Sequence, residues 1–305
     1  MKRLNSAITS LLATIIFLGA TFIHSPITFA ATKSGLQQND YQNHAEKAKI
    51  EYVVKNKLMW LYPDGNFRPN QMITQADLVV GLSNVKALSA GAPVPELPAN
   101  HWAKSYYERA KKDGILHNIQ INPNQVLNRE EASKIMVNAW ESFRKTRTQK
   151  ENGTLVTQPY SQISVSYQWL PKKSGKFING ASTSMYDAFS NVTRAELAYA
   201  LSALHFDKVG ITEGEKIATQ IHNSLKMTNT TLSGKIPSAP GYSIRILVRY
   251  QKGNSSEYTS GSFSVNKSQI KYVQLSVKRK GEAVPLALYN YVKLPSSLER
   301  ESVRW

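Results

Sequence analysis

The spacing of apolar residues changes part-way along the chain. In the first two thirds, apolar side chains recur every three or four positions, as in 197–204, which predicts amphipathic helices. From about residue 229 the period becomes two, as in 244–248, where apolar and polar residues alternate. The sequence therefore predicts an α+β protein. A mostly helical part is followed by a small antiparallel, sandwich-like β domain at 229–305.

A five-residue signal occurs three times in the helical part, at 73–77, 127–131 and 192–196. In the third copy, Thr193 and Glu196 form a capping box, in which each side chain accepts a hydrogen bond from the other residue's backbone amide. Apolar residues at helical spacing follow each copy, so each copy is predicted to begin a helix. Residues 43–71 also match 100–125, which extends the repeat.

These matches predict three helix–loop–helix units at 43–90, 97–145 and 160–208. The first helices of the first two units are expected at about 44–57 and 101–113. The first loop contains Pro63-Asp64-Gly65, a turn that the second unit lacks.

The third unit has no clear first helix; Tyr167–Pro171 is the best candidate for its remnant, after a polar connection at 146–165. Thr212 and Glu215 form another capping-box pattern, which predicts a separate connecting helix at 211–228.

The C-terminal part is predicted to contain four strands, separated by a loop at 253–256 and a turn at 281–282; these strands cover 242–250, 262–265, 272–277 and 286–292. Six basic residues are candidates for a basic face on it: Arg245, Arg249, Lys271, Lys278, Arg279 and Lys280. Such a domain could bind a wall polymer, associate with itself through an edge strand, or act as a spacer.

The first 30 residues have the layout of a secretory signal peptide: a basic start, an apolar run at 11–20, and small residues before Ala31. An uncleaved membrane anchor is the alternative, but Ser25-Pro26 and the small residues favour cleavage. With no second apolar run of spanning length, we expect a secreted chain without membrane attachment.

Composition narrows the possible partners. The chain has 38 Lys+Arg and 21 Asp+Glu, a formal net charge of +17, and residues 229–305 alone contain 12 basic and 4 acidic residues. This charge favours polyanions, and export favours anionic cell-wall polymers over nucleic acid. Cysteine is absent, which excludes disulfides and thiolate chemistry. The six histidines lack metal-ligand spacing and no catalytic motif is present, so we expect no cofactor, metal or enzymatic activity.

The repeated signal resembles the Ile-Thr-Arg-Ala-Glu motif of S-layer homology domains. His101-Trp102-Ala103, Tyr62–Gly65 and Phe67–Asn70 resemble other hallmarks of that repeat. The resemblance covers about 43–206 and is stronger in the first two units. It implies three repeats folded as a pseudo-threefold helical bundle. It also implies non-covalent binding to a secondary cell-wall polymer, commonly one that carries pyruvate ketals.

The residue after each helix N-cap is the candidate ligand. This position is expected on an exposed first turn, where free N–H groups and the helix dipole attract an anion. Arginine there adds a fork of donors for a carboxylate. Arg129 and Arg194 are therefore the predicted carboxylate ligands, with Trp102 covering a sugar face and Gln75 as a weaker, uncharged counterpart. The alternative is that each arginine is an ordinary solvated charge.

The sequence as a whole predicts a secreted, non-enzymatic surface protein, anchored to a pyruvylated wall polysaccharide and typical of Gram-positive bacteria. Two alternatives stay open. One is an enzyme of wall metabolism that uses the repeats only for targeting, and the other is a subunit of an S-layer lattice.

Overall fold

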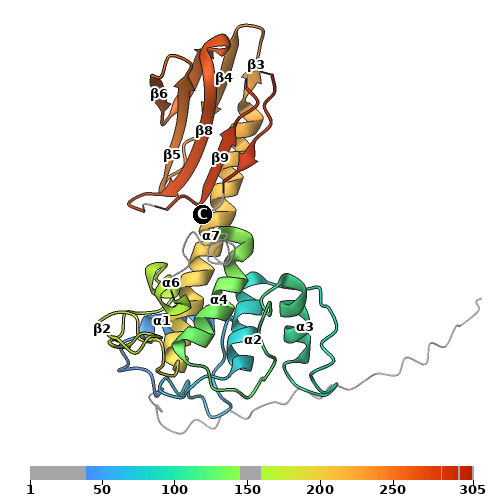
Figure 1. Ribbon diagram of the computed structural model, residues 1–305, viewed down its shortest axis with the longest axis vertical. Helices are drawn as coiled ribbons and strands as arrows, with labels where there is room; N and C mark the ends of the chain where they lie inside the picture. Colours follow the sequence, from blue (N-terminus) through green and yellow to red (C-terminus); the bar gives the residue numbers. More distant parts are fainter. Residues whose placement is uncertain (1–38, 145–158, 283, 295, 304–305) are drawn as a thin grey trace, which may run out of the picture. The chain divides into compact units, whose positions relative to one another are not determined.

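The computed structural model describes residues 39–144, 159–282, 284–294 and 296–303 (Figure 1). The predicted signal peptide and most of the predicted connection at 146–165 lie outside these residues. Helices occupy the first part of the described chain and antiparallel strands the second, so the predicted α+β class is confirmed. No helix in the described ranges is both long and apolar enough to cross a membrane.

The helices of the first part form three successive pairs: α1 (Lys47–Lys55) with α2 (Gln75–Lys86), α3 (Lys104–Asp113) with α4 (Arg129–Arg144), and α6 (Tyr160–Ser166) with α7 (Arg194–Ser224). The second helix of each pair begins at the five-residue signal. Capping boxes are present at Thr74 with Asp77 and at Thr193 with Glu196. In the middle copy, Asn128 and Glu131 exchange the equivalent bonds at 2.9 Å. The three predicted helix starts are therefore confirmed.

The three signals are joined to one another by a closed ring of backbone hydrogen bonds. The amide of Ile73 donates to Val192 O at 2.9 Å, that of Val192 to Leu127 O at 3.0 Å, and that of Leu127 to Ile73 O at 3.2 Å. All three side chains are buried in the core of the helical part. The ring thus holds the starts of α2, α4 and α7 together, although these residues are far apart in the sequence.

The first helix of the third pair lies earlier than expected. It is α6, at Tyr160–Ser166, so the prediction of a remnant at Tyr167–Pro171 is wrong. Gln168 has a φ of 58°, which ends the helical path, and Trp169 turns into the core. There its ring meets Trp140 at a centroid distance of 5.9 Å. Trp169, the largest apolar residue of this segment, therefore packs in the core and does not belong to a helix.

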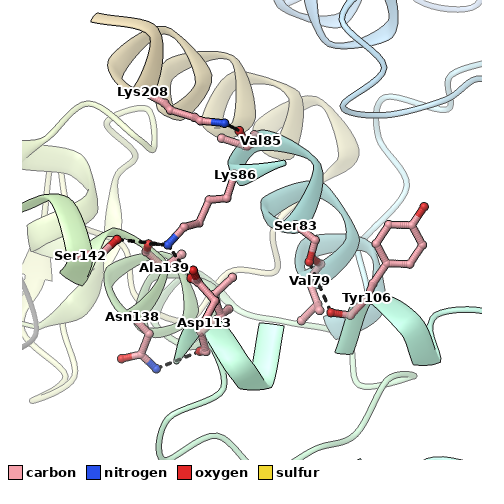
Figure 2. A network of polar contacts seen from close by, with 11 residues as sticks. Val79, Ser83, Val85, Lys86, Tyr106, Asp113, Asn138, Ala139, Ser142 and Lys208 are labelled. Atoms are coloured by element: carbon pink, nitrogen blue, oxygen red, sulfur yellow. Dashed lines mark hydrogen bonds and ion pairs between the residues drawn. The ribbon is translucent and has the colours of Figure 1, made fainter. Parts of the chain in front are cut away.

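A buried lysine at the end of α2 joins three helices (Figure 2). Lys86 Nζ, at the end of α2, donates to Asp113 Oδ2 at 2.5 Å and to Ala139 O at 2.7 Å, in α3 and α4. Its side chain is 5% exposed, so the pairing with Asp113 compensates a charge removed from water. Lys208 of α7 donates to Val85 O at 3.0 Å, and burial together with the charge of Lys86 lowers the pKa of Lys208.

Helix α7 continues without a break through the predicted capping box at Thr212, so the prediction of a separate connecting helix at 211–228 is wrong. Thr212 Oγ1 donates back to Lys208 O at 3.0 Å, one turn earlier in the same helix, instead of accepting from a following amide. Gly214 lies inside the helix, where an added Cβ would come within 2.7 Å of Leu286 Cβ. Close packing explains this glycine without a helix end.

The C-terminal part contains two antiparallel sheets, with strand orders β10-β9-β8-β5-β6 and β3-β4-β7. Their bounds are β3 Lys226–Met227, β4 Thr231–Ile236, β5 Tyr242–Tyr250, β6 Ser255–Tyr258, β7 Gly261–Asn266, β8 Ile270–Arg279, β9 Ala287–Tyr291 and β10 Glu301–Ser302. The four predicted strands are confirmed as β5, β7, β8 and β9. Ser255 and Ser256, predicted as loop, belong to β6.

Both sheets share a core with the last turns of α7. Ile217, Ala218 and Ile221 from the helix pack with strand residues such as Ile246 and Leu275. A domain boundary at residue 229 is therefore too late, because it would remove the helix from the core that it completes.

In the third helical pair, a small hairpin, β1 (Gly175–Lys176) with β2 (Ser182–Thr183), occupies the loop.

Candidate functional site

The side chain after each N-cap reaches into the loop of a different helical pair. Arg194, the first residue of α7, donates from Nε to Phe67 O at 2.8 Å and from Nη2 to Trp60 O at 2.9 Å. Both carbonyls belong to the loop between α1 and α2. Its guanidinium carbon also lies 4.7 Å from the centroids of Tyr62 and Phe67. Arg194 is therefore fixed in place by a loop more than 120 residues away.

Arg129, the first residue of α4, makes the corresponding contacts with the loop of the third pair. Its Nε donates to Asp187 O at 2.9 Å and its Nη2 to Pro171 O at 2.5 Å. A third bond joins Nη1 to Glu196 Oε1 at 2.8 Å. Every nitrogen of this guanidinium is therefore used inside the protein, and its charge is neutralised by Glu196.

Gln75, the first residue of α2, is held in the same way by the second pair. Its Nε2 donates to Gln120 O at 2.9 Å. Its Oε1 accepts from the Tyr107 hydroxyl and the Asn122 amide, both at 2.9 Å. The side chain is 1% exposed, and burial raises the pKa of Tyr107 well above its ordinary value. Gln75 therefore acts as a packed link between two loops.

The expected exposed first turn is not observed at any of these positions. Arg129 is 0% exposed and Arg194 is 6% exposed. The first two amides of α7 donate to Gln71 O at 2.8 Å and Pro69 O at 3.0 Å. Those of α4 and α2 donate to neighbouring loops in the same manner. The prediction of free N–H groups that attract an anion is therefore wrong, because loops of other pairs already occupy them.

A groove of about 340 Å³ lies beside Arg194 and is lined by Leu58, Met59, Trp60, Leu61, Tyr62, Pro63, Asp77, Val80, Trp102 and Arg194. Two indoles border it with much of their surface in solvent, since Trp60 is 50% exposed and Trp102 is 63% exposed. The structure thus brings two predicted site residues, Arg194 and Trp102, into one groove. Arg129 and Gln75 lie outside it.

Arg194 lines this groove, and one nitrogen of its guanidinium is not used in a hydrogen bond to the described residues. Among the described residues, Nη1 has no hydrogen-bond partner and the guanidinium has no ion pair. The nearby carboxylate, Asp77, is engaged in its own capping box, where Oδ2 accepts from the Thr74 amide at 2.8 Å and from the Thr74 hydroxyl at 2.9 Å. Burial lowers the pKa of Arg194, and the charges of Tyr62 and Asp77 act in the opposite direction.

This arrangement suits a carboxylate attached to a sugar. An open guanidinium edge donates strong, charge-assisted hydrogen bonds to a carboxylate. The bordering indoles offer large apolar faces with one polar edge each, which fits a sugar ring. Within the described ranges, no cluster of three or more His, Asp or Glu side chains could hold a metal ion.

Sequence reasoning missed Trp60 and Tyr62 as groove residues. The backbone carbonyl of Trp60 accepts a hydrogen bond from Arg194. In the other two pairs, Gln120 O accepts the corresponding bond from Gln75, and Pro171 O accepts it from Arg129. Loops of different length conceal this equivalence in the sequence. The turn at Pro63–Gly65 is as predicted, with a φ of 82° at Gly65.

Comparison with known families identifies the segment that supplies most of this groove. Residues 39–79 match the family model of the S-layer homology domain. The match supports an S-layer homology domain in this chain, and such domains generally bind secondary cell-wall polymers at the cell surface. It therefore indicates a protein associated with the cell surface or cell wall. The matched segment contains Trp60, Tyr62 and Asp77. No match was found among curated proteins.

Proposed function

We propose that this protein is a secreted, non-enzymatic surface protein that is held non-covalently on the cell wall. The groove beside Arg194 binds an anionic secondary wall polysaccharide, and the anionic group is a pyruvate ketal on a sugar. The observation that carries this proposal is that Arg194, whose Nη1 has no hydrogen-bond partner among the described residues, lines one groove with two exposed indoles. A ketal carboxylate would pair with Arg194 while Trp60 and Trp102 cover the sugar.

The proposal includes three S-layer homology repeats in a pseudo-threefold bundle, of which the second and third lie beyond the matched segment. The closed ring through Ile73, Leu127 and Val192 supports this arrangement. So do the equivalent bonds that Gln75, Arg129 and Arg194 make to the next loop. Each helical pair therefore has the same set of neighbours.

Only one of the three equivalent positions is proposed to bind ligand. Arg129 is paired with Glu196, and Gln75 is uncharged and only 1% exposed. The positions that correspond to Trp60 are Gln120 and Pro171, which offer no aromatic face. Charge, donor and sugar-covering surface coincide only at Arg194.

Co-sedimentation with purified cell walls tests the proposal. Trp102→Ala removes an exposed side chain that lines the groove, and we expect at least about tenfold weaker binding, or about 1.4 kcal/mol. Phe189→Ala is the matched control, because Phe189 is 53% exposed and does not line the groove. Stripping the secondary polymer from the walls should abolish wild-type binding. Equal binding of Trp102→Ala and wild type would reject the groove as the binding site.

A further inference from the structure

Four cationic side chains lie together at one end of the larger β-sheet. Arg249 lies at the end of β5 and Lys252 in the turn after it. Lys267 begins the short 3-10 turn before β8, and Lys271 is the second residue of β8. The two segments are neighbours, since Arg249 pairs with Tyr272 and the Gln251 amide donates to Gln269 O at 2.9 Å. We call these four residues the cationic tip; Figure 1 shows β5, β6 and β8, the strands that carry or border it.

The backbone under the cationic tip is held by several bonds. Gln251 Nε2 donates to Ile270 O at 3.2 Å, which adds to the bond from its amide. The turn after β5 is closed by Tyr250 N to Asn254 O at 3.0 Å, with Gly253 at a φ of 90°. A β-bulge between Arg249 and Tyr250 changes the register there. The four cations therefore project from a fixed scaffold.

The charge of the tip is not compensated within the described part of the protein. The sequence has no Asp or Glu in 216–256 or 258–281. Glu257, between these ranges, lies 3.6 Å from Arg245, and Glu282 and Glu299 pair with Arg279 and Lys293. None of the four tip cations forms an ion pair with a described residue, and Arg249, Lys252 and Lys271 are exposed. Neighbouring like charges repel one another, so a bound anion would stabilise this end of the sheet.

The six basic residues named as candidates for a basic face differ in their surroundings. Arg279 is occupied by Glu282 and by the Phe206 carbonyl, and Arg245 by Glu257. Lys278 and Lys280 lie at the opposite end of β8 from Lys271. The unpaired charge is therefore concentrated at the tip rather than spread over the sheet.

We propose that the cationic tip binds a polymer of phosphodiester groups, such as a wall teichoic acid, as a second wall contact separate from the groove. Three of the four cations are lysines, which bind phosphate as point charges, whereas carboxylate recognition favours the arginine fork. The cations come from two separate turns, so they can contact successive phosphates of an extended chain. Two sites on one chain raise the overall retention through avidity.

The test is a titration of the full-length protein with purified glycerol-phosphate teichoic acid at several salt concentrations. The tip variant is Lys252→Gln with Lys271→Gln. The control is Lys235→Gln with Lys280→Gln, because these two lysines are also exposed, belong to the same domain and have no ion pair among the described residues. We expect at least about tenfold weaker binding and a shallower salt dependence for the tip variant alone. Equal losses in both variants would reduce the tip to general charge attraction and overturn the proposal.

Two further measurements distinguish binding at the tip from binding in the groove, and a teichoic acid from other anionic ligands. Trp102→Ala should bind teichoic acid as wild type does, even where it loses wall glycan, so failure of the groove and failure of the tip are distinguishable. Polygalacturonate and phosphatidylglycerol vesicles serve as carboxylate and lipid probes. Tighter, tip-dependent binding to polygalacturonate than to teichoic acid would overturn the phosphodiester assignment. Tighter, tip-dependent binding to the vesicles would overturn the wall polymer as the source of the phosphodiester groups.

Discussion

Arg194 and Arg129 occupy the same place in the repeated unit and have different surroundings. Both donate from Nε and Nη2 to two carbonyls of a neighbouring loop. They differ at Nη1, which bonds Glu196 in Arg129 and has no hydrogen-bond partner among the described residues in Arg194. The repeated motif therefore positions the guanidinium, and a residue from another helical pair determines whether it is available.

The residue that makes this difference is the third of the neighbouring helix. It is Glu196 beside Arg129 and Asp77 beside Arg194, and both accept the amide of their own N-cap. The glutamate has one more methylene, and its second oxygen spans the distance to the arginine. Lys173, which lies two residues before β1, is 3.6 Å from the same oxygen. The charge of Arg129 is thus paired with a carboxylate, whereas that of Arg194 is not.

The largest expected difference concerns stability. Arg129→Met should lower the free energy of unfolding by about 3–5 kcal/mol, because it leaves Glu196 without its buried partner. Arg194→Met should cost about 1–3 kcal/mol, because it removes hydrogen bonds but unpairs no carboxylate. Urea unfolding of both variants measures the two values. A larger loss for Arg194→Met would contradict the assignment of Arg129 as the structural member of the pair.

The second prediction converts the open site into the closed one. In Asp77→Glu, the longer carboxylate should reach Nη1 of Arg194 as Glu196 reaches Arg129. We expect an unchanged melting temperature and about tenfold weaker wall binding, or about 1.4 kcal/mol. Glu131→Asp is the matched control, since it changes the equivalent helix position beside the uncharged Gln75. Wild-type binding by Asp77→Glu would show that the Nη1 edge is not where the ligand binds.

The third prediction opens the closed site. Glu196→Ala leaves Arg129 and Lys173 without their shared carboxylate, so the variant should be destabilised and then partly restored by sodium acetate. An acetate concentration ten times its dissociation constant would return about 1.4 kcal/mol. Thermal melts in acetate and in chloride at equal ionic strength measure this. Glu131→Ala should gain nothing from acetate, and an equal gain in both variants would mean that the rescue is not due to Arg129.

The smallest expected effect is a dependence of fold stability on pH, and it arises from histidines rather than from the two arginine sites. Burial lowers the pKa of His205 and of His222, and Lys208 and Arg300 add to the shift. The unfolded chain then binds more protons than the folded one, so stability should fall as the pH drops below about 6.5, the ordinary histidine pKa. His205→Gln should flatten this dependence between pH 7.5 and 5.5 in urea unfolding. An equally steep dependence in that variant would exclude His205 as a source.

The elements were predictable where local chemistry determines them. The boxes at Thr74 and Thr193 fix helix starts through bonds within four residues, and the alternation in β5 reflects one buried face. The box at Thr212 failed because nothing in the preceding turn ends the helix, and its hydroxyl bonds backward. A cap motif is informative only where the chain before it leaves helical geometry.

The candidate site was predictable only in part, because its availability depends on contacts between distant segments. Arg194 and Trp102 could be selected from the motif, but the meeting of Arg194 with Trp60 depends on a hydrogen bond that spans 134 residues. The exposure of the arginines was misjudged, since the loops that cover them lie 42 to 134 residues away. Pairing between Arg129 and Glu196 likewise spans 67 residues.

The unbroken course of α7 has a mechanical consequence. Its first residue, Arg194, belongs to the groove, while Ile217 and Ile221 complete the core of the β-sheets. At 31 residues and about 1.5 Å per residue, it is a strut about 46 Å long. If the proposed groove holds the wall, tension applied to the β-sheets would travel along this helix to the groove. The boundary predicted at residue 229 contains no flexible linker that would absorb the tension, so the proposed binding groove and the β-sheets are joined by one continuous helix.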